Sequence, residues 1–150
     1  MKGRFALGAF VDDALAGFTF AGPLEHFSHV QGPNEDAHLH RKNTLYSADV
    51  TVDPDHRGKG VGKALKAAQI RTALLERDGE GLPRYSFITG RNRLGHTPAM
   101  AGINGSFGAY PVARYSGQYG VSGGVATYYR IPLRRICLLY TSDAADEHSW

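Results

Sequence analysis

The clearest chemical signal in this sequence is a glycine-rich segment, Arg57–Leu65, which reads RGKGVGKAL. It follows a strand-like run, Leu45–Val52, and opens a run of good helix formers that extends to about Arg77. Glycines between a strand and a helix let the backbone approach a bulky ligand with its N–H groups turned outward. A helix N-terminus adds unpaired N–H donors and partial positive charge, and Lys59 and Lys63 add full charges. The segment therefore predicts a site for a phosphate or pyrophosphate.

The spacing of the glycines separates the common kinds of phosphate-binding turn. A nucleotide P-loop needs G-x-x-x-x-G-K followed by Ser or Thr, but Arg57 stands where its first glycine should be and alanine follows Lys63. A dinucleotide-binding turn needs G-x-G-x-x-G, and here Gly58–Gly60 is followed by a glycine one position too early, at Gly62. Neither pattern fits. A glycine-rich turn with a solvated lysine pair is the alternative without a ligand.

The same residues match an acyl-CoA signature, Q/R-x-x-G-x-G/A, through Arg57, Gly60 and Gly62. With Val52 and Pro54 just upstream, the segment resembles the GNAT family of N-acetyltransferases. The resemblance implies an α+β fold with a mixed, mostly antiparallel sheet flanked by helices, and acetyl-CoA or another acyl-CoA as cosubstrate. It covers about 5–133, and the usual first strand and two front helices are missing before it.

The elements predicted along the chain have the order of this family from its second strand onward. Strands are predicted at Phe5–Val11, Leu15–Phe20, Leu45–Val52, Tyr85–Thr89, Tyr110–Tyr119 and Val125–Ile131, and helices at 60–77 and Ala99–Phe107. Thr97-Pro98 is typical of a helix start. The segment 24–43 shows no clear period and predicts a long loop.

One face of the first helix is expected to pack on the sheet. Its apolar residues are Val61, Ala64, Leu65, Ala68 and Leu75, which fall together at helical spacing.

By the resemblance, the glycine turn and the strand before it hold the cosubstrate. Backbone amides of the turn would bind the pyrophosphate, the strand edge would pair with the pantetheine arm, and a main-chain N–H would polarise the thioester carbonyl. The predicted binding residues are Val50, Thr51, Val52, Arg57, Gly58, Lys59, Gly60, Val61, Gly62, Lys63, Ala64 and Asn92. Asn92 has an alternative role as a turn former. Arg91 and Arg93 would contact the CoA phosphates or coat the surface.

The proton donor and the base are harder to assign. GNAT members often carry a tyrosine in a Tyr-x-x-x-Gly-Phe stretch, which protonates the CoA thiolate, but here Asn104 occupies the tyrosine position and Ala109 the phenylalanine position. Asparagine supplies no proton, although it can hydrogen-bond the sulfur or pantetheine, and Tyr110 is a nearby substitute. Asp49 is a candidate base acting through water, or a solvated carboxylate. Strand alternation places it and Tyr46 on opposite faces.

Histidines in the predicted loop offer further possibilities. They are His26, His29, His38 and His40. A neutral imidazole there could serve as base, the spacing could hold a metal, or the side chains could lie on the surface; we predict no metal. His56, in the turn, is expected to face solvent.

Composition limits the class of protein. The chain has 150 residues, 42% hydrophobic and 21% charged, which suits one globular domain. No membrane-length apolar run and no signal peptide are seen, so a cytoplasmic location without membrane partners is expected. The net charge of +3 suits an anionic cosubstrate, whereas specific nucleic-acid binding would need interleaved aromatic and basic residues, which are not seen.

The C-terminal residues differ from the rest of the chain. Cys137–Glu147 read as the in-frame translation of a transposase adapter used in sequencing libraries. We therefore expect residues 1–135 to form a GNAT domain that is incomplete at its N-terminus, and 136–150 to be a non-native tail; a native extension is the alternative. Without the tail, 17 basic residues face 11 acidic ones and no cysteine is left, which favours direct acyl transfer over an acyl-enzyme.

The sequence thus predicts an N-acyltransferase that passes an acetyl group from acetyl-CoA to an unidentified amine in a ternary complex; its oligomeric state stays open, with a homodimer as one candidate. The alternatives are a non-catalytic acyl-CoA-binding or regulatory module, and an inactive fragment of a longer acetyltransferase.

Overall fold

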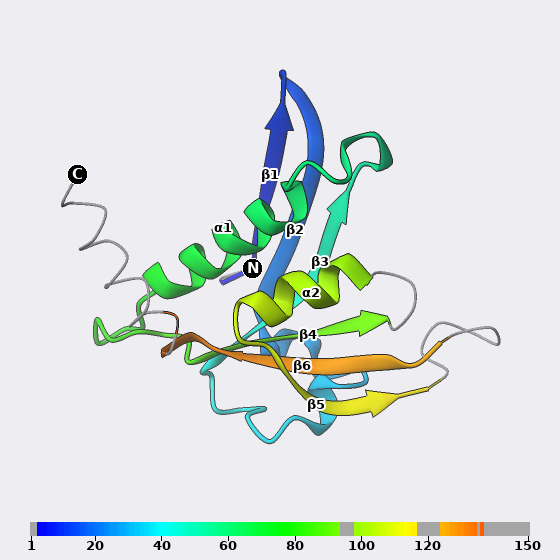
Figure 1. Ribbon diagram of the computed structural model, residues 1–150. Coiled ribbons are helices and arrows are strands. Elements are labelled where there is room, and N and C mark those ends of the chain that lie inside the picture. Colours follow the sequence, from blue (N-terminus) through cyan, green and yellow to red (C-terminus); the bar gives the residue numbers. More distant parts are fainter. Residues whose placement is uncertain (1–2, 94–97, 117–123, 135, 137–150) are drawn as a thin grey trace.

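The architecture rests on one mixed sheet (Figure 1). In the computed structural model, which describes residues 3–93, 98–116, 124–134 and 136, six strands pair in the order β1-β2-β3-β4-β6-β5. The strands are β1 (Phe5–Val11), β2 (Ala14–Pro23), β3 (Thr44–Val52), β4 (Phe87–Arg93), β5 (Tyr110–Tyr115) and β6 (Ala126–Pro132). Neighbours are antiparallel except β3 and β4, which are parallel. The predicted α+β fold with a mostly antiparallel sheet is confirmed.

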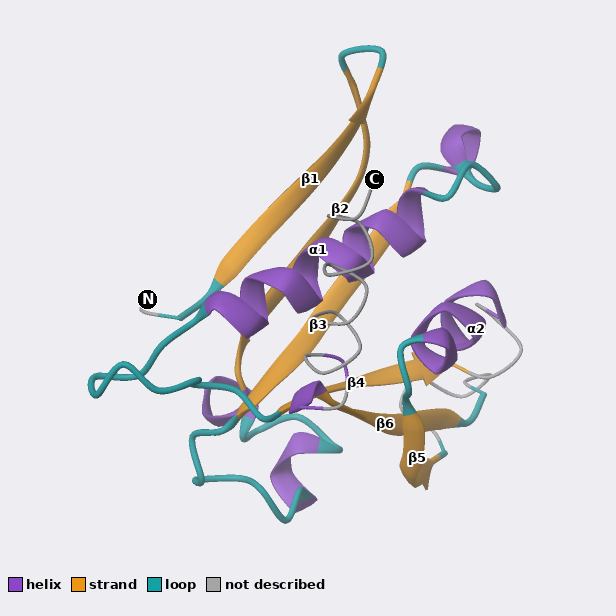
Figure 2. Ribbon diagram, turned by 60° about the vertical axis from the view of Figure 1, so that its left-hand side comes forward, coloured by secondary structure: helices purple, strands orange, loops and turns teal. Residues whose placement is uncertain are grey.

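Two helices and a long loop flank this sheet (Figure 2). Helix α1 (Val61–Leu75) crosses β1, β2 and β3, and α2 (Pro98–Ser106) contacts α1. The loop between β2 and β3 contains two short 3-10 turns, η1 (Leu24–Phe27) and η2 (Pro33–Glu35), and a third, η3 (Pro54–His56), leads toward α1. Successive residues of β6 face opposite sides, and Tyr129 contacts α1 while Tyr128 contacts the loop. The loop therefore covers the face opposite α1.

The centre of the sheet opens where β3 and β4 separate. Their pairing ends at Ser47 and Gly90, although β3 continues to Val52 and β4 to Arg93. β4 stays paired with β6 along its whole length, so the two parallel strands diverge, as Figure 2 shows. Among the described residues, no strand pairs with the β4-facing edge of β3 beyond Ser47.

A bulge in β3 coincides with this opening. Phe20 pairs with Asp49 but its neighbour Ala21 pairs with Ser47, so Ala48 is the extra residue. Before the bulge, Ser47 faces α1 and accepts a hydrogen bond from Gln69; after it, Val50 packs with the α1 residues. The bulge therefore reverses the alternation.

The buried face of α1 differs from the predicted one. Its buried residues are Val61, Leu65, Lys66, Gln69, Ile70 and Ala73. Ala64 is exposed and Leu75 is 70% exposed, so the prediction was wrong for both. The reason is that the sheet beneath α1 presents polar groups, and Lys66 and Gln69 are buried in hydrogen bonds with them.

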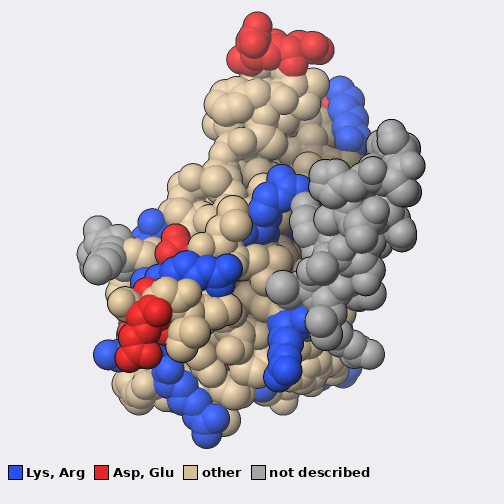
Figure 3. Space-filling model, turned by 90° about the vertical axis from the view of Figure 1, so that its left-hand side faces the viewer, with Lys and Arg blue, Asp and Glu red and all other residues tan. Residues whose placement is uncertain are grey.

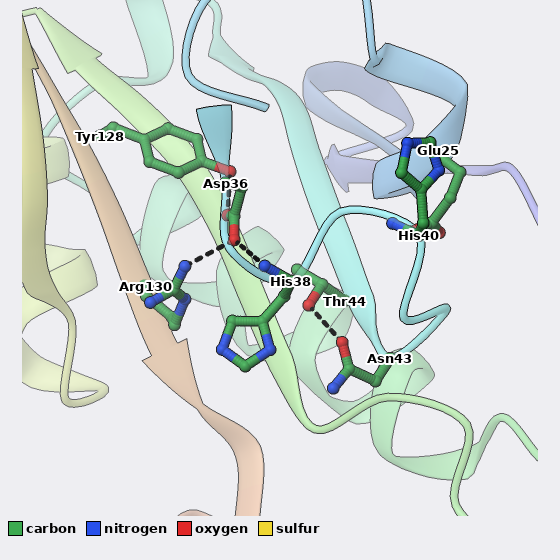
Figure 4. Close-up of polar contacts among 8 residues, drawn as sticks. All are labelled: Glu25, Asp36, His38, His40, Asn43, Thr44, Tyr128 and Arg130. Atoms are coloured by element: carbon green, nitrogen blue, oxygen red, sulfur yellow. Dashed lines mark hydrogen bonds and ion pairs between the residues drawn. The ribbon is translucent and has the colours of Figure 1, made fainter. Parts of the chain in front are cut away.

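A buried carboxylate holds the long loop to β6 (Figure 4). Asp36 accepts hydrogen bonds from the Tyr128 hydroxyl at 2.6 Å, from Arg130 Nη2 at 2.7 Å and from the His38 backbone N–H at 2.8 Å. Both Asp36 and Arg130 are 8% exposed. The His38 ring stacks 4.5 Å from the ring of Phe87, and burial is the main cause that lowers the pKa of His38. The segment predicted as a loop is thus packed on the sheet.

Most predicted element boundaries lie within three residues of the observed ones. Two are corrected: β2 runs three residues further, to Pro23, and β4 lies further along the chain, at Phe87–Arg93 instead of Tyr85–Thr89. Thr97, residues 117–119 of the predicted last hairpin, and 137–150 of the predicted tail lie outside the described residues. Within those described, no helix combines the length and the apolar character that a membrane crossing needs.

Candidate functional site

The start of α1 presents backbone N–H groups that the helix does not use. Gly58 and Gly60 have φ of 78° and 81°, a left-handed conformation that glycine adopts without strain. The first helical hydrogen bond runs from the Ala64 N–H to the Gly60 carbonyl at 3.0 Å. The N–H groups of 61–63 therefore have no partner inside the helix. Ala64 was predicted to bind the cosubstrate, but its N–H is committed to the helix.

A pocket of about 750 Å³ opens beside this turn, and we call it the α1 pocket. Nine of the twelve predicted binding residues line it: Val50, Thr51, Val52, Arg57, Gly58, Gly60, Val61, Gly62 and Lys63. His56 and the α2 residues Ala99, Met100 and Ile103 complete the lining. Lys59 and Ala64 do not line it, and Asn92 lies in the next pocket.

The free edge of β3 borders the α1 pocket. The Asp53 N–H donates to the Ala16 carbonyl of β2 at 2.8 Å, and Thr19 Oγ1 donates to the Asp49 carbonyl at 2.8 Å. Because peptide groups alternate in direction along a strand, those of Val50 and Val52 point the other way, toward the open side. They offer donors and acceptors for an extended ligand that carries amide groups.

A second pocket, of about 420 Å³, lies where β3 and β4 separate, and we call it the β3–β4 pocket. Its lining is Tyr46, Ser47, Ala48, Asp49, Val50, Arg91, Asn92, Arg93, Met100, Asn104 and Tyr129. Val50 and Met100 also line the α1 pocket, so the two pockets adjoin. Arg91 and Arg93 line this pocket and do not line the α1 pocket.

The β3–β4 pocket contains two of the three predicted catalytic residues. Asn104 is 1% exposed, and its Nδ2 donates to Asn92 Oδ1 at 3.0 Å. Its Oδ1 is buried without a hydrogen-bond partner among the described residues. Asp49 is exposed, and its carboxylate accepts a hydrogen bond from Thr51 Oγ1 at 2.8 Å. Tyr110 is on β5, 43% exposed, and lines neither pocket.

The predicted orientation of Asp49, on the face opposite Tyr46, was wrong because of the bulge. Tyr46 packs with Leu24 and Tyr128 on the face opposite α1. Asp49 alternates with Val50, which packs toward α1. Asp49 and Tyr46 therefore share a face, because the extra residue Ala48 lies between them.

Sequence reasoning missed a buried polar network behind the β3–β4 pocket. Lys66 Nζ donates to Tyr129 Oη and to Gln69 Oε1, each at 2.9 Å. Gln69 Nε2 then donates to Thr19 Oγ1 at 2.8 Å and to Ser47 Oγ at 3.0 Å. Burial lowers the pKa of Lys66 to about 7 and raises the pKa of Tyr129.

The sequence held one usable signal for this network. Lys66 and Gln69 are three residues apart and share a helix face with Val61, Leu65 and Ile70. Nothing in the sequence singled out Tyr129, whose hydroxyl is placed by the pairing of β4 with β6.

The histidines lie mostly away from both pockets. His26 Nδ1 accepts a hydrogen bond from Arg4 Nε at 3.1 Å, and His38 packs on Phe87. His56 does line the α1 pocket, with its side chain 18% exposed and 3.4 Å from Asp53; its expected solvent-facing position was wrong. The described residues contain no group of three or more His, Cys, Asp or Glu side chains that could hold a metal ion.

Charge is unevenly distributed over one face of the molecule (Figure 3). Acidic side chains gather at the tip of the β1–β2 hairpin, where Asp12 and Asp13 form the turn. Basic side chains lie in separate patches on the described part of this face, not in one continuous band.

Comparisons with known proteins agree with this geometry. The family model described as "Acetyltransferase (GNAT) family" matches residues 2–89. A search of curated proteins finds no match.

Similar solved structures are also acetyltransferases. The ribosomal-protein-S18-alanine N-acetyltransferase from Escherichia coli has a TM-score of 0.63 and 16% identity over 89% of this chain and 71% of its own. Nourseothricin acetyltransferase has a TM-score of 0.63 and 22% identity, with 88% and 66% covered. Naa50 from Arabidopsis thaliana, in complex with the bisubstrate analogue CoA-Ac-MVNAL, has a TM-score of 0.59 and 12% identity, with 83% and 70% covered. At these identities the likeness shows the fold.

Proposed function

This chain belongs to the acetyltransferase (GNAT) family, whose model matches more than half of it, and we propose that it transfers an acetyl group from acetyl-CoA to an amine in a ternary complex. The observation that carries the proposal is the continuity of three features. Unpaired N–H groups at the start of α1, the free edge of β3 and the β3–β4 pocket follow one another along two adjoining pockets, which share Val50 and Met100. That order matches the pyrophosphate, the pantetheine arm and the thioester of acetyl-CoA.

The described residues at the start of α1 fit a pyrophosphate. Gly62 has no side chain, and a Cβ there would lie 3.3 Å from Ile103 Cδ1 and 3.5 Å from Met100 Sδ, so glycine keeps the space between α1 and α2 open. The helix N-terminus and Lys63 supply positive charge beside unpaired N–H donors. Together they offer hydrogen-bond donors and positive charge to a dianionic group.

The thioester end would use main-chain and side-chain groups of the β3–β4 pocket. The Val50 N–H, on the open side of β3, is positioned to polarise the thioester carbonyl. Asp49 would take the proton of the acceptor amine through water. The unpartnered Oδ1 of Asn104 would accept a hydrogen bond from an N–H of the pantetheine arm. Tyr110 lies outside both pockets, so this mechanism gives it no step.

A non-catalytic acyl-CoA-binding module is the second candidate function. The observation in its favour is Asn104, which stands where the family resemblance expects a tyrosine and has no proton to give. Such a module would bind acetyl-CoA at the α1 pocket and release no CoA when amines are added.

Two glycines with the same backbone conformation allow a matched test. Gly60 and Gly81 have φ of 81° and 79°, and a Cβ at either meets nothing within 4 Å, so Gly60→Val and Gly81→Val introduce similar backbone strain. Only Gly60 borders the α1 pocket. Acetyl-CoA at about 100 times Kd adds about 2.7 kcal/mol to the stability of a binding protein, which is a rise in Tm of roughly 5–10 °C.

We expect acetyl-CoA to raise the Tm of the unmodified chain and of Gly81→Val, and not that of Gly60→Val. Release of CoA thiol with a panel of primary amines then measures transfer. Binding without thiol release for every amine would favour the module, and an equal Tm rise in Gly60→Val would contradict the assignment of the α1 pocket.

A further inference from the structure

The buried pair Lys66 and Tyr129 has no role in holding the cosubstrate. Lys66 is 0% exposed and its Nζ is bonded to two neutral oxygens, Tyr129 Oη and Gln69 Oε1. A buried ammonium without a carboxylate partner is unfavourable. An apolar residue would fill this position of α1 at a lower cost in folding free energy, so a lysine here indicates a functional role.

Tyr129 connects this lysine to the β3–β4 pocket. The side chain is 4% exposed, and it lines the pocket together with Asn104. Gly90 of β4 makes room for it, because a Cβ at that position would lie 2.5 Å from Tyr129 Oη. Oη accepts the hydrogen bond from Lys66, so its own hydrogen is free to point to another acceptor. A proton can therefore pass from Nζ to Oη while the phenol proton leaves toward the pocket.

The groups around the pair are mostly uncharged. Thr19 of β2, Ser47 of β3 and Gln69 of α1 form the buried network, and Asn104 of α2 lines the β3–β4 pocket together with Tyr129. The titratable and charged groups at the pocket end are Tyr46 and Asp49 of β3 and Arg91 and Arg93 of β4. Burial lowers the pKa of Lys66 to about 7, so both of its protonation states are populated near neutral pH.

On the basis of the proposed acetyl transfer, we propose that Tyr129 is the catalytic acid that protonates the departing CoA sulfur, and that Lys66 is the positioning residue that resupplies its proton. This pair would supply the proton that Asn104 lacks. As the acceptor nitrogen bonds to the acetyl carbon, the C–S bond breaks and its electron pair stays on sulfur. Tyr129 Oη–H gives its proton to that sulfur, and Lys66 Nζ gives a proton to Oη. The nitrogen loses its proton through water to Asp49, which passes it to solvent, and neutral Lys66 regains a proton from solvent.

The relay has a defined pH dependence. Donation requires the protonated form of Lys66, which disappears as pH rises through its lowered pKa. The rate advantage that Lys66 gives should therefore be full below pH 7 and decline above it. Comparing two proteins at each pH removes the titration of the acceptor amine, which affects both equally.

Three variants test the proposal, with a fourth as control. Tyr129→Phe removes the hydroxyl and Lys66→Met the ammonium, and the double variant removes both, which leaves neither group buried without its partner. Tyr85→Phe is the control, because Tyr85 is also a buried tyrosine of the same core cluster, 5% exposed, with a hydroxyl that lines neither pocket. The Tm rise with acetyl-CoA verifies folding and binding in each, and thiol release with an amine that the unmodified chain accepts gives kcat.

We expect kcat to fall about 100-fold in Tyr129→Phe, to fall in Lys66→Met, and to stay unchanged in Tyr85→Phe. The double variant should lose no more than Tyr129→Phe, because residues acting in series are not additive. The ratio of unmodified to Lys66→Met rates should fall toward one above pH 7. A ratio that is the same at every pH, or a Tyr129→Phe rate equal to that of Tyr85→Phe, overturns the relay while acetyl transfer itself stands. Absence of thiol release from the unmodified chain overturns both.

Discussion

The two adjoining pockets are built in different ways. The α1 pocket is lined mainly by one continuous stretch of chain, 50–63, with α2 closing its side. The β3–β4 pocket takes its lining from β3, β4, α2 and β6, which are separated by many residues in sequence. A site formed by adjacent residues leaves a pattern in the sequence, whereas a site assembled from distant elements leaves isolated residues whose meaning depends on the fold.

Two lysines of α1 show the same contrast within one helical turn. Lys63 is exposed and lines the α1 pocket, where positive charge attracts an anion. Lys66 is fully buried behind the β3–β4 pocket and bonded to neutral groups. By our two proposals, the same residue type therefore serves binding at one place and proton supply at the other. Substituting each separately tests whether the two pockets are independent.

The two largest expected effects are on stability, and the first is in Lys66→Met. The pKa of Lys66 is about 7 in the folded chain against 10.5 for a free lysine, and each pKa unit corresponds to about 1.36 kcal/mol, so the buried ammonium costs roughly 5 kcal/mol at pH 7 and below. The unfolded chain binds the extra proton between pH 7 and 10.5, so the free energy of unfolding rises with pH across that range. Removing the ammonium in Lys66→Met removes this cost. The variant also leaves Tyr129 and Gln69 without their hydrogen-bond donor, which cancels about 1–3 kcal/mol of the stability gained.

Urea denaturation at pH 6.5 and at pH 10 measures this difference. Lys66→Met should be more stable than the unmodified chain at the lower pH and lose that advantage at the higher one. Lys63→Met should show neither change, because Lys63 is exposed. Equal stability of the Lys66→Met and unmodified proteins at both pH values would mean that Lys66 is not buried as an amine of lowered pKa.

The second, of similar size, is expected in Asp36→Ala, on the opposite face of the sheet. Removing one partner of a buried ion pair costs about 3–5 kcal/mol, since Arg130 and the Tyr128 hydroxyl would lose their acceptor. The adjacent Glu35 is a matched control, because its contact with the Tyr115 hydroxyl is exposed and should be worth under about 1 kcal/mol.

Asp36→Ala also tests whether the two pockets act independently. The loop held by Asp36 packs against β6, the strand of Tyr129, and it contributes no residue to the α1 pocket. Well below the melting transition, Asp36→Ala should therefore keep its affinity for acetyl-CoA while thiol release slows. Isothermal titration and the thiol assay measure the two quantities, and an equal loss of both would show that the pockets depend on one another.

The smallest effect is expected for Lys63→Met on acetyl-CoA affinity. An exposed charge beside an anion contributes at most about 1 kcal/mol, which is roughly fivefold in Kd. The loss should shrink as salt is raised, because ions screen exposed charges. Titrations at low and high salt measure it, and Lys42→Met, an exposed lysine that lines neither pocket, is the control. A loss that does not depend on salt would assign Lys63 a packing role instead.

The fold was largely predictable from sequence because its signals are local. Alternating apolar residues identified β1, and the glycine turn marked the passage from β3 to α1. Nine of the twelve predicted binding residues do line one pocket, although their contact with acetyl-CoA stays a prediction. Ala64 and Leu75 were misplaced because apolar character alone set the predicted helix face, and the sheet offered polar partners to Lys66 and Gln69 instead.

The orientation of Asp49 and the position of Tyr129 were not predictable. A one-residue bulge at Ala48 moves every later side chain of β3 to the opposite face of the sheet. No residue type in the sequence predicts this bulge. Tyr129 reaches the pocket because β6 pairs with β4 and Gly90 leaves room for its hydroxyl. Both depend on strand pairing between distant segments.

By itself, the sequence determined the family, the mixed sheet and the glycine turn before α1, since a strand, three glycines and a helix start act through neighbouring backbone groups. Only the tertiary structure decided where β3 and β4 separate, which face Asp49 occupies, and that Lys66 is buried against Tyr129. These depend on register and burial, and a residue's pKa and its partners are set by what packs around it rather than by its neighbours in the chain.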